Sequence, residues 1–207
     1  IYGSEVDRVP CICPGGMMNM VITELMNECG IMWPEAHTDA EQMAKLSMAV
    51  YDYGMFENYG VPFCMTIEAE GMGVKVDMGS TKYEPHVVEY VINSVSKYNQ
   101  LESLDINSGR AKVTIDAISI LESKENSVPI IGNLSGPISV ASSIMDPVVY
   151  YKELRKKKDD ANKFMEFVTN QIIEFGKAQV KAGADVIAIS DPSGTGEILG
   201  PAYFEEY

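Results

Sequence analysis

Residues 182–195 read AGADVIAISDPSGT, and this stretch decides the fold. Gly183 is suited to end a helix, because glycine adopts the left-handed backbone conformation without steric cost. Residues 184–190 form a nearly unbroken apolar run, which is typical of a parallel strand covered on both faces. The run stops before Asp191 and Ser193, and parallel α/β folds bind ligands at the carboxyl ends of their strands. Asp191 is therefore a candidate catalytic residue and Ser193 a candidate substrate-binding residue.

Three further apolar runs predict strands of the same kind, at residues 9–13, 61–66 and 128–132. Helical spacing of apolar residues, with caps and stop signals, predicts helices at residues 17–28, 39–58, 110–124, from 147 to the basic run 155–158, and from 159 to 183. Weaker patterns predict extended excursions at 74–78 and 83–98. Alternation of strand and helix indicates a parallel sheet with right-handed crossovers, in which the four strands are neighbours in chain order.

Four such units fit either a small open sheet or half of a (β/α)8 barrel, since a complete barrel typically needs about 250 residues. The loops after the other strands supply further candidates. Asn133 and Ser135, in the loop predicted at 133–137, are candidate substrate contacts. A Gly-Gly turn that opens a helix can bind an anion through free N–H groups, although a plain turn fits equally. Acids at strand ends can instead cap helices or pair with arginines. The remaining candidates are Glu68, Glu70, Gly15 and Gly16.

Composition narrows the class of protein. The net charge is −14, from 30 acidic and 16 basic side chains, which argues against nucleic-acid and anionic-membrane partners. No apolar run reaches the 18 residues that a membrane span needs. The four cysteines form no CxxC pair, and they indicate free thiols in a cytoplasmic protein.

Four separated pieces resemble the uroporphyrinogen decarboxylase superfamily, in the order in which that family has them. They are EVDRVPCICPGG (5–16), TIEAEGMGVKVDMGS (66–80), VPIIGNLSGPISVASSIMDP (128–147) and AGADVIAISDPSGTGEILGPAYFEEY (182–207). The resemblance implies a (β/α)8 TIM barrel, of which this chain covers about the first four β/α units as a single domain over residues 1–207. It also implies a fragment, because the family continues beyond the fourth strand.

The methyltransferase branch of the superfamily, the methylcobamide:coenzyme M methyltransferases, matches better than the decarboxylase branch. Its resemblance lies in EAE at 68–70, DMG at 77–79 and DPS at 191–193. The decarboxylases carry an arginine-rich motif after the first strand, where this chain reads CPGGM at 13–17. Their catalytic aspartate corresponds to Cys64 here. The substrate of the decarboxylases bears eight carboxylates and needs cations at the mouth of the barrel. The loops of this chain offer acidic side chains there instead.

The resemblance therefore implies a corrinoid-dependent methyltransferase, with Asp191 and Glu68 as catalytic residues. The methyl donor is a methylcobamide carried by a partner corrinoid protein, and the acceptor is a thiol such as coenzyme M, or tetrahydrofolate. In that branch zinc lowers the pKa of the acceptor thiol, but its ligands follow the fifth strand, beyond Tyr207, so no metal site is expected within the chain.

Two alternatives stay open: a uroporphyrinogen decarboxylase of porphyrin biosynthesis, and a non-catalytic half-barrel fragment, which is either inert or docks a corrinoid protein. A half-barrel has open strand edges. We therefore expect a homo-oligomer, or pairing with the missing C-terminal half.

Overall fold

The computed structural model describes residues 1–207 apart from 1–2, 4, 17–20 and 125–126. Its strands are β1 (Tyr59–Val61), β2 (Lys75–Asp77), β3 (His86–Glu89), β4 (Ile130–Ser135) and β5 (Val186–Ser190). Its α-helices are α1 (Thr23–Cys29), α2 (Ala40–Asp52), α3 (Ile67–Gly71), α4 (Gly109–Glu122), α5 (Pro137–Ile144), α6 (Pro147–Lys156), α7 (Lys158–Ala182), α8 (Gly196–Leu199) and α9 (Pro201–Glu206). Two 3-10 helices, η2 (Glu35–His37) and η3 (Val95–Gln100), lie in the connections.

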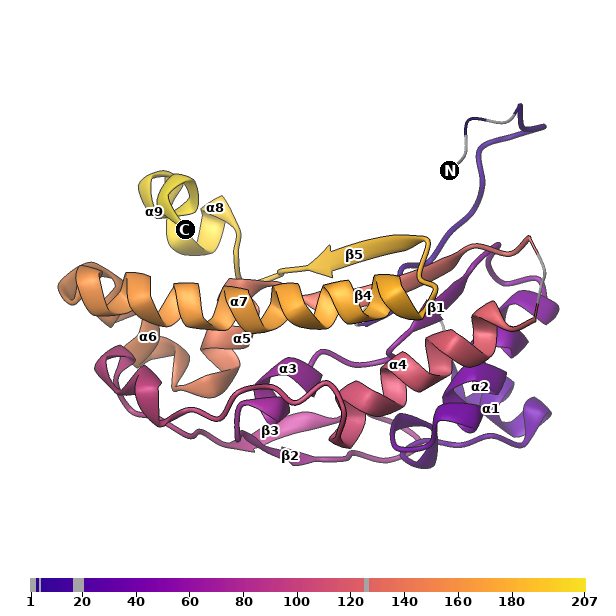
Figure 1. The fold of residues 1–207 in the computed structure, drawn as a ribbon, viewed down its shortest axis with the longest axis horizontal. Coiled ribbons are helices and arrows are strands. Elements are labelled where there is room, and N and C mark those ends of the chain that lie inside the picture. The colour runs from indigo at the N-terminus through magenta and orange to yellow at the C-terminus, as the bar shows by residue number, and fades with distance from the viewer. Residues whose placement is uncertain (1–2, 4, 17–20, 125–126) are drawn as a thin grey trace.

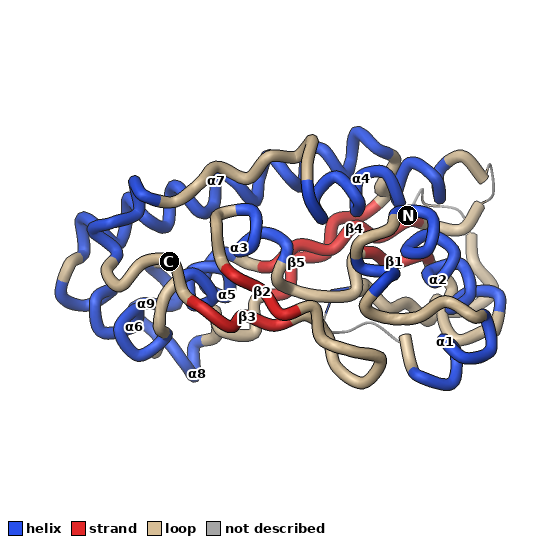
Figure 2. Tube along the Cα trace, turned by 90° about the horizontal axis from the view of Figure 1, so that it is seen from below, coloured by secondary structure: helices blue, strands red, loops and turns tan. Residues whose placement is uncertain are grey.

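The main sheet is parallel and has the order β1-β4-β5, with Val61 beside Gly132 and Ser135 beside Ser190. The predicted chain order of these three strands is confirmed, but the range predicted for the second strand is wrong. It was residues 61–66, and β1 shares only Val61 with it, because Pro62 has no N–H for the ladder and residues 62–66 form the connection to α3. The excursion between β1 and β4 is an antiparallel hairpin of β2 and β3. Figures 1 and 2 show the long helix α7 alongside β4 and β5, with α4 on the same side of the sheet.

The prediction of a strand at residues 9–13 is wrong. This segment is extended but forms no ladder with β1, because its hydrogen bonds go elsewhere. The Cys11 carbonyl accepts from the Glu57 N–H at 2.9 Å, and the Cys13 N–H donates to the Asn58 side chain at 2.8 Å. The segment still passes close to the sheet, since a Cβ on Gly60 would lie 3.0 Å from the Cys13 carbonyl oxygen.

Helix ends follow the local signals at most positions. The Asp39 side chain accepts from the N–H of Gln42, and that of Asp146 from the N–H of Val149, so both predicted N-caps are confirmed. Gly183 ends α7 with φ 117°. The helix predicted to reach residue 58 stops at residue 52, and Gly54 then turns the chain with φ 69°. The predicted start of the first helix, residues 17–20, lies outside the described residues.

The third strand was predicted to end at Gly132, but β4 continues to Ser135. Asn133 and Ser135 are therefore strand residues, 1% and 2% exposed, and not members of a loop. Helix α5 begins directly after Gly136, where only a Gly-Pro loop had been predicted. A proline at the first helical position makes that start favourable.

The two faces of the main sheet have different roles. Leu134 packs towards α7, because a Cβ on Gly176 would lie 2.9 Å from its Cδ1 atom. Since side chains alternate along a strand, Asn133 and Ser135 point to the opposite face. The helix-covered face joins two hydrophobic clusters, one around α5 to α7 and one around α2, β1 and α4. The opposite face is where the polar candidates gather.

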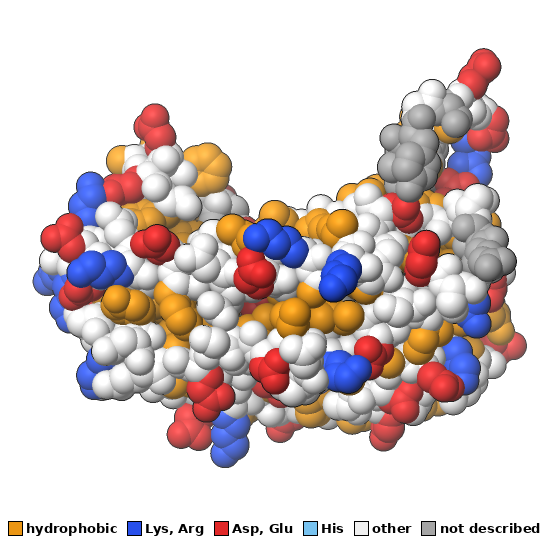
Figure 3. All heavy atoms as spheres, viewed as in Figure 1, with side chains coloured by type: hydrophobic (Ala, Val, Ile, Leu, Met, Phe, Trp, Pro, Cys, Tyr) orange, Lys and Arg blue, Asp and Glu red, His pale blue; other side chains and the backbone are white. Residues whose placement is uncertain are grey.

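No described strand pairs with the outer edge of β5. Ile189 on this strand is 64% exposed. Figure 3 shows that the molecule is hollowed on this side, between the C-terminal helices and the N-terminal segment, with hydrophobic side chains along the floor. Among the described helices, none is long and apolar enough to cross a membrane.

Candidate functional site at the carboxyl ends of the strands

A pocket of about 350 Å³ lies where the three parallel strands end, and we call it the mouth pocket. Its walls come from the loop after β1, from α5, from the loop after β5 and from the β3 side of the hairpin. The lining residues are Met65, Thr66, Glu84, Pro85, His86, Val87, Tyr90, Ser139, Ser142, Ser143, Pro192 and Ser193. The predicted substrate residue Ser193 is thus part of the wall.

Asp191 lies beside the mouth pocket and joins two of its walls. Its carboxylate accepts hydrogen bonds from the N–H of Ile138 at 3.1 Å, the N–H of Ser139 at 2.8 Å and the Ser139 hydroxyl at 2.6 Å. It therefore caps the first turn of α5 from a position more than 50 residues away. Gly136 and Gly194 leave room for it, because a Cβ on either would lie under 3 Å from the Asp191 side chain. This geometry fixes the loop after β5 against α5.

The serine hydroxyls of α5 direct their protons into the protein. Ser142 and Ser143 both donate to the carbonyl oxygen of Ser139, at 3.0 and 2.9 Å. The Ser139 hydroxyl donates to Asp191 and accepts from the N–H of Ser193 at 3.2 Å. Ser142 and Ser143 line the mouth pocket, and a hydroxyl can either donate or accept, so both can serve a ligand there.

Glu68 lies beneath the mouth, 3% exposed, in direct contact with Ser135. One carboxyl oxygen accepts from the N–H of Ser135 at 2.7 Å, and the other is 2.9 Å from its hydroxyl. That hydroxyl also lies 3.2 Å from the carbonyl oxygen of Met65. Burial raises the pKa of Glu68, against the opposing effect of the Ser135 hydrogen bonds. A protonated Glu68 can donate to the Ser135 hydroxyl while that hydroxyl donates to Met65, so every group has a partner.

Asn133 stands on the same face, next to the Gly-Gly turn. Its side-chain oxygen accepts from Ser190 at 3.1 Å, whereas its buried NH2 group has no partner among the described residues. A Cβ on Gly16 would lie 2.1 Å from that nitrogen, so only glycine fits there. The Gly16 N–H donates to the Pro62 carbonyl at 2.8 Å, and Gly15 has φ 99°. The turn thus seats the N-terminal segment against the sheet.

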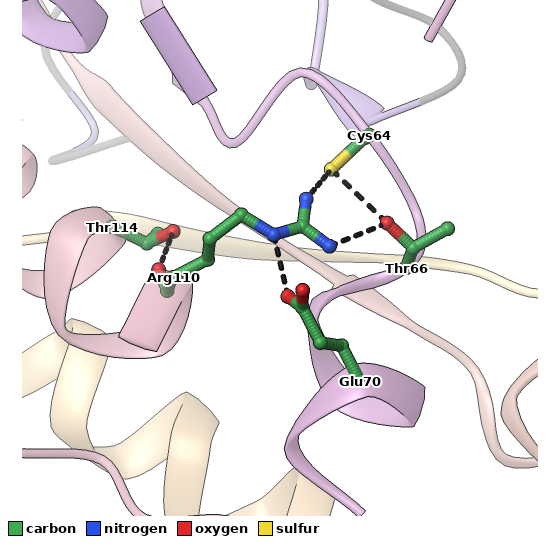
Figure 4. A network of polar contacts seen from close by, with 5 residues as sticks. All are labelled: Cys64, Thr66, Glu70, Arg110 and Thr114. Atoms are coloured by element: carbon green, nitrogen blue, oxygen red, sulfur yellow. Dashed lines mark hydrogen bonds and ion pairs between the residues drawn. The ribbon is translucent and has the colours of Figure 1, made fainter. Parts of the chain in front are cut away.

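Arg110 was not among the predicted site residues, and it organises the loop after β1. Figure 4 shows its guanidinium pointing from α4 towards Cys64, Thr66 and Glu70. It donates to the Cys64 sulfur at 3.1 Å, to the Thr66 hydroxyl at 2.8 Å and to the Glu70 carboxylate at 2.5 Å. Its side chain is only 5% exposed, whereas that of Glu70 is 35% exposed. Burial raises the pKa of the Cys64 thiol, although the positive charge of Arg110 opposes that shift.

One sequence signal could have identified Arg110. It shares a helical face with Thr114 and Ala117, four and seven residues later, and all three are buried. A lone cation on a buried helical face needs an anionic partner, and Glu70 supplies it.

A larger cavity, of about 430 Å³, lies outside the mouth, between α3, the start of α4 and the loop at 102–108. Glu70 and Arg110 line it, whereas Thr66 lines the mouth pocket. The Arg110 network is therefore the wall between the two cavities. We base the candidate site on the smaller one, because the strand ends meet there.

Within the described residues, no group of three or more His, Cys, Asp and Glu side chains could hold a metal ion. His37 is fully buried against Trp33 and Phe63. Burial and then the charge of Arg110 lower the pKa of His37 to about 3, so its ring is neutral. His86 lines the mouth pocket from β3.

Comparisons with known proteins agree with this architecture. The family model for uroporphyrinogen decarboxylase (URO-D) matches residues 1–207. The methylcobamide:CoM methyltransferase MtbA of Methanosarcina acetivorans is 34% identical over 203 residues, which are 98% of this chain and 59% of that protein. The methylcobamide:CoM methyltransferase MtaA of Methanosarcina barkeri is 36% identical over 210 residues, covering 100% of this chain and 60% of that protein.

The solved structure of a methyltransferase from Methanosarcina mazei superimposes with a TM-score of 0.88 at 33% identity, over 99% of this chain and 60% of that one. The chain thus spans about 60% of the length of these relatives. The fold is that of part of a TIM barrel of this type.

Proposed function

This chain belongs to the uroporphyrinogen decarboxylase family, and from that premise we propose that it serves methyl transfer from a methylcobamide to a thiol. The donor would be carried by a partner corrinoid protein. The acceptor would be coenzyme M, or another acceptor such as tetrahydrofolate. We place the protein in the cytoplasm. The similar relatives are named as methylcobamide:CoM methyltransferases, and the chain covers about 60% of each.

The observation that carries the proposal is the absence of arginine from the mouth pocket. None of the three arginines of the sequence lines it. Arg8 pairs with Glu57, Arg110 is buried in its own network, and Arg155 lies over the ring of Tyr203, 5.5 Å from its centre. A substrate with many carboxylates needs such cations, since a buried carboxylate without a partner is strongly destabilised. Decarboxylation of a polycarboxylate is therefore the less favoured reaction for this pocket.

Within this function we propose that Asp191 and Glu68 position the mouth pocket. The hydrogen bonds of Asp191 support that role, because they hold the loop that carries Ser193. The contact between Glu68 and Ser135 supports the same role for the loop after β1. We also propose substrate-side roles for Asn133 and for the hydroxyl-bearing wall.

We propose that the other predicted binding residues support the walls of the mouth pocket without lining it. They are Glu70, Gly15 and Gly16. Their contacts with Arg110, Pro62 and Asn133 favour that assignment. We assign zinc to none of the described residues, which hold no group of three ligand-type side chains. We propose that any zinc ligands lie beyond Tyr207, as the resemblance implies.

The test is a pair of assays on the protein that carries these 207 residues. Methyl transfer from methylcobalamin to 2-mercaptoethanesulfonate is followed by the visible absorbance of the corrinoid, and carbon dioxide release is measured with uroporphyrinogen. We expect methyl transfer and no decarboxylation. Carbon dioxide release without methyl transfer would refute the proposal.

A further inference from the structure

The loop after β1 is held in place by side chains more than by backbone pairing. Its residues 62–66 form neither helix nor strand. From α4, Arg110 donates to the Cys64 sulfur at 3.1 Å and to the Thr66 hydroxyl at 2.8 Å (Figure 4). Thr66 in turn lines the mouth pocket. The position of this wall of the mouth pocket therefore depends on where the guanidinium of Arg110 lies.

Arg110 also has space and a second set of acceptors on its other side. It lines the cavity of about 430 Å³ outside the mouth, which we call the outer cavity, together with Glu102 and Asp105. Glu102 is exposed, and its carboxylate is paired with none of the described residues. Glu70, the present ion-pair partner, lines the same cavity and has a side chain that is 35% exposed. A guanidinium that turned outward would thus keep carboxylates within reach.

We infer that Arg110 is a latch with two positions on the wall of the mouth pocket. The closed position is the one in the structure, in which Arg110 binds Cys64, Thr66 and Glu70. In the open position it turns into the outer cavity, exchanges Thr66 for Glu102, and releases the loop after β1. Whatever fills the outer cavity would therefore hold the latch closed and fix the shape of the mouth pocket.

The balance of contacts makes the open position the minor one. The bond to the Thr66 hydroxyl is charge-assisted and buried, whereas an ion pair with the exposed Glu102 contributes less. The open position is still accessible, because Glu70 can move with Arg110 and the guanidinium is never left without an anion. Two sites can be coupled through an element that has two discrete arrangements, and the latch is such an element between the outer cavity and the mouth pocket.

The test is hydrogen exchange read by mass spectrometry in peptides that cover residues 63–72, because the exchange rate follows the population of the open loop. Thr66→Val removes an acceptor that only the closed position uses, so exchange should become about tenfold faster. Glu102→Gln removes a carboxylate that only the open position uses, so exchange should become about threefold slower. Opposite signs are expected because the two variants act on opposite positions of one latch.

Two further variants show whether the opening is local and uses the outer cavity. Ser103→Trp places a bulky side chain in that cavity, so it should slow the exchange of residues 63–72 at least about threefold, in the parent and in Thr66→Val alike. Glu166→Gln is the matched control for Glu102→Gln, because it removes an exposed carboxylate on α7, away from both cavities. It should leave the exchange unchanged.

A Glu102→Gln protein that exchanges as fast as the parent or faster would overturn the inference, since a fixed wall needs no acceptor in the outer cavity. Equal slowing in Glu166→Gln would overturn it too, because the effect would then be one of net charge. If Thr66→Val speeds exchange in α7 peptides as much as in the loop, the protein unfolds as a whole, and Ser103→Trp in the parent then decides. No methyl transfer enters these measurements, so the latch and the proposed function fail separately.

Discussion

Replacing Arg110 tests whether its network holds the loop after β1. Arg110→Met keeps much of the stem but removes the donors to Cys64, Thr66 and Glu70. Breaking a fully buried ion pair from one side costs about 3–5 kcal/mol. The Glu70 side chain is 35% exposed, so water can hydrate its carboxylate once Arg110 is gone. We therefore expect a loss of about 2–3 kcal/mol in the free energy of unfolding.

The assay is urea denaturation followed by circular dichroism, with the midpoint compared at constant slope. Arg8→Met is the matched control, because Arg8 also pairs with a glutamate but is 59% exposed. Exposed ion pairs contribute little, so its midpoint should equal that of the parent. Arg110→Met combined with Glu70→Gln should lose less stability than the sum of the single changes. An Arg110→Met midpoint as high as that of Arg8→Met would refute the reasoning.

Three further predictions follow from the site and the open edge. Burial raises the pKa of Glu68, so its contribution to stability is present below the unfolded-state pKa and is lost as pH rises through the folded-state pKa. Glu68→Gln should therefore flatten the fall in urea midpoint above about pH 4.5, and an unchanged pH profile would contradict it. Asp191→Ala should lower methyl transfer at least about tenfold and cost about 1–2 kcal/mol of stability as a lost cap. Asp146→Ala, which removes the α6 cap away from the mouth pocket, should reduce stability alone, and equal rates in both variants would make Asp191 purely structural. The open edge of β5, with Ile189 64% exposed, should drive self-association, and sedimentation of a cooperatively folded monomer at micromolar concentration would exclude it.

Local chemistry predicted most helix ends and the existence of three of the four strands, although α2 ends at Asp52 instead of residue 58 and β1 shares only Val61 with its predicted range. Asp39, Asp146 and Gly183 each act within one turn of a helix end, so a sequence reading can identify them. The segment at residues 9–13 has the right apolar residues but bonds to the backbone N–H of Glu57 and the side chain of Asn58. That difference depends on residues more than 40 positions away.

The sequence predicted less of the candidate site than of the fold, again because the deciding contacts join residues that are far apart in the chain. Strand ends placed Asp191 and Ser193 near the mouth, as the parallel sheet requires. The helix that Asp191 caps begins 54 residues earlier, so α5 had no local cap to reveal it. Arg110 likewise finds its partners about 40 to 46 residues back in the chain. Contacts of that range are set by packing, which a local pattern does not contain.

The buried position of Cys64 gives the protein an internal reporter. Cys11 is exposed, whereas Cys64 is 2% exposed behind Arg110 and Thr66. Burial also keeps the thiol protonated, and a thiol reacts through its thiolate. A cysteine-directed reagent should therefore modify Cys11 quickly and reach Cys64 only when the loop after β1 opens. The rate of that slow modification measures the local opening free energy of the barrel mouth in the native protein, without denaturant.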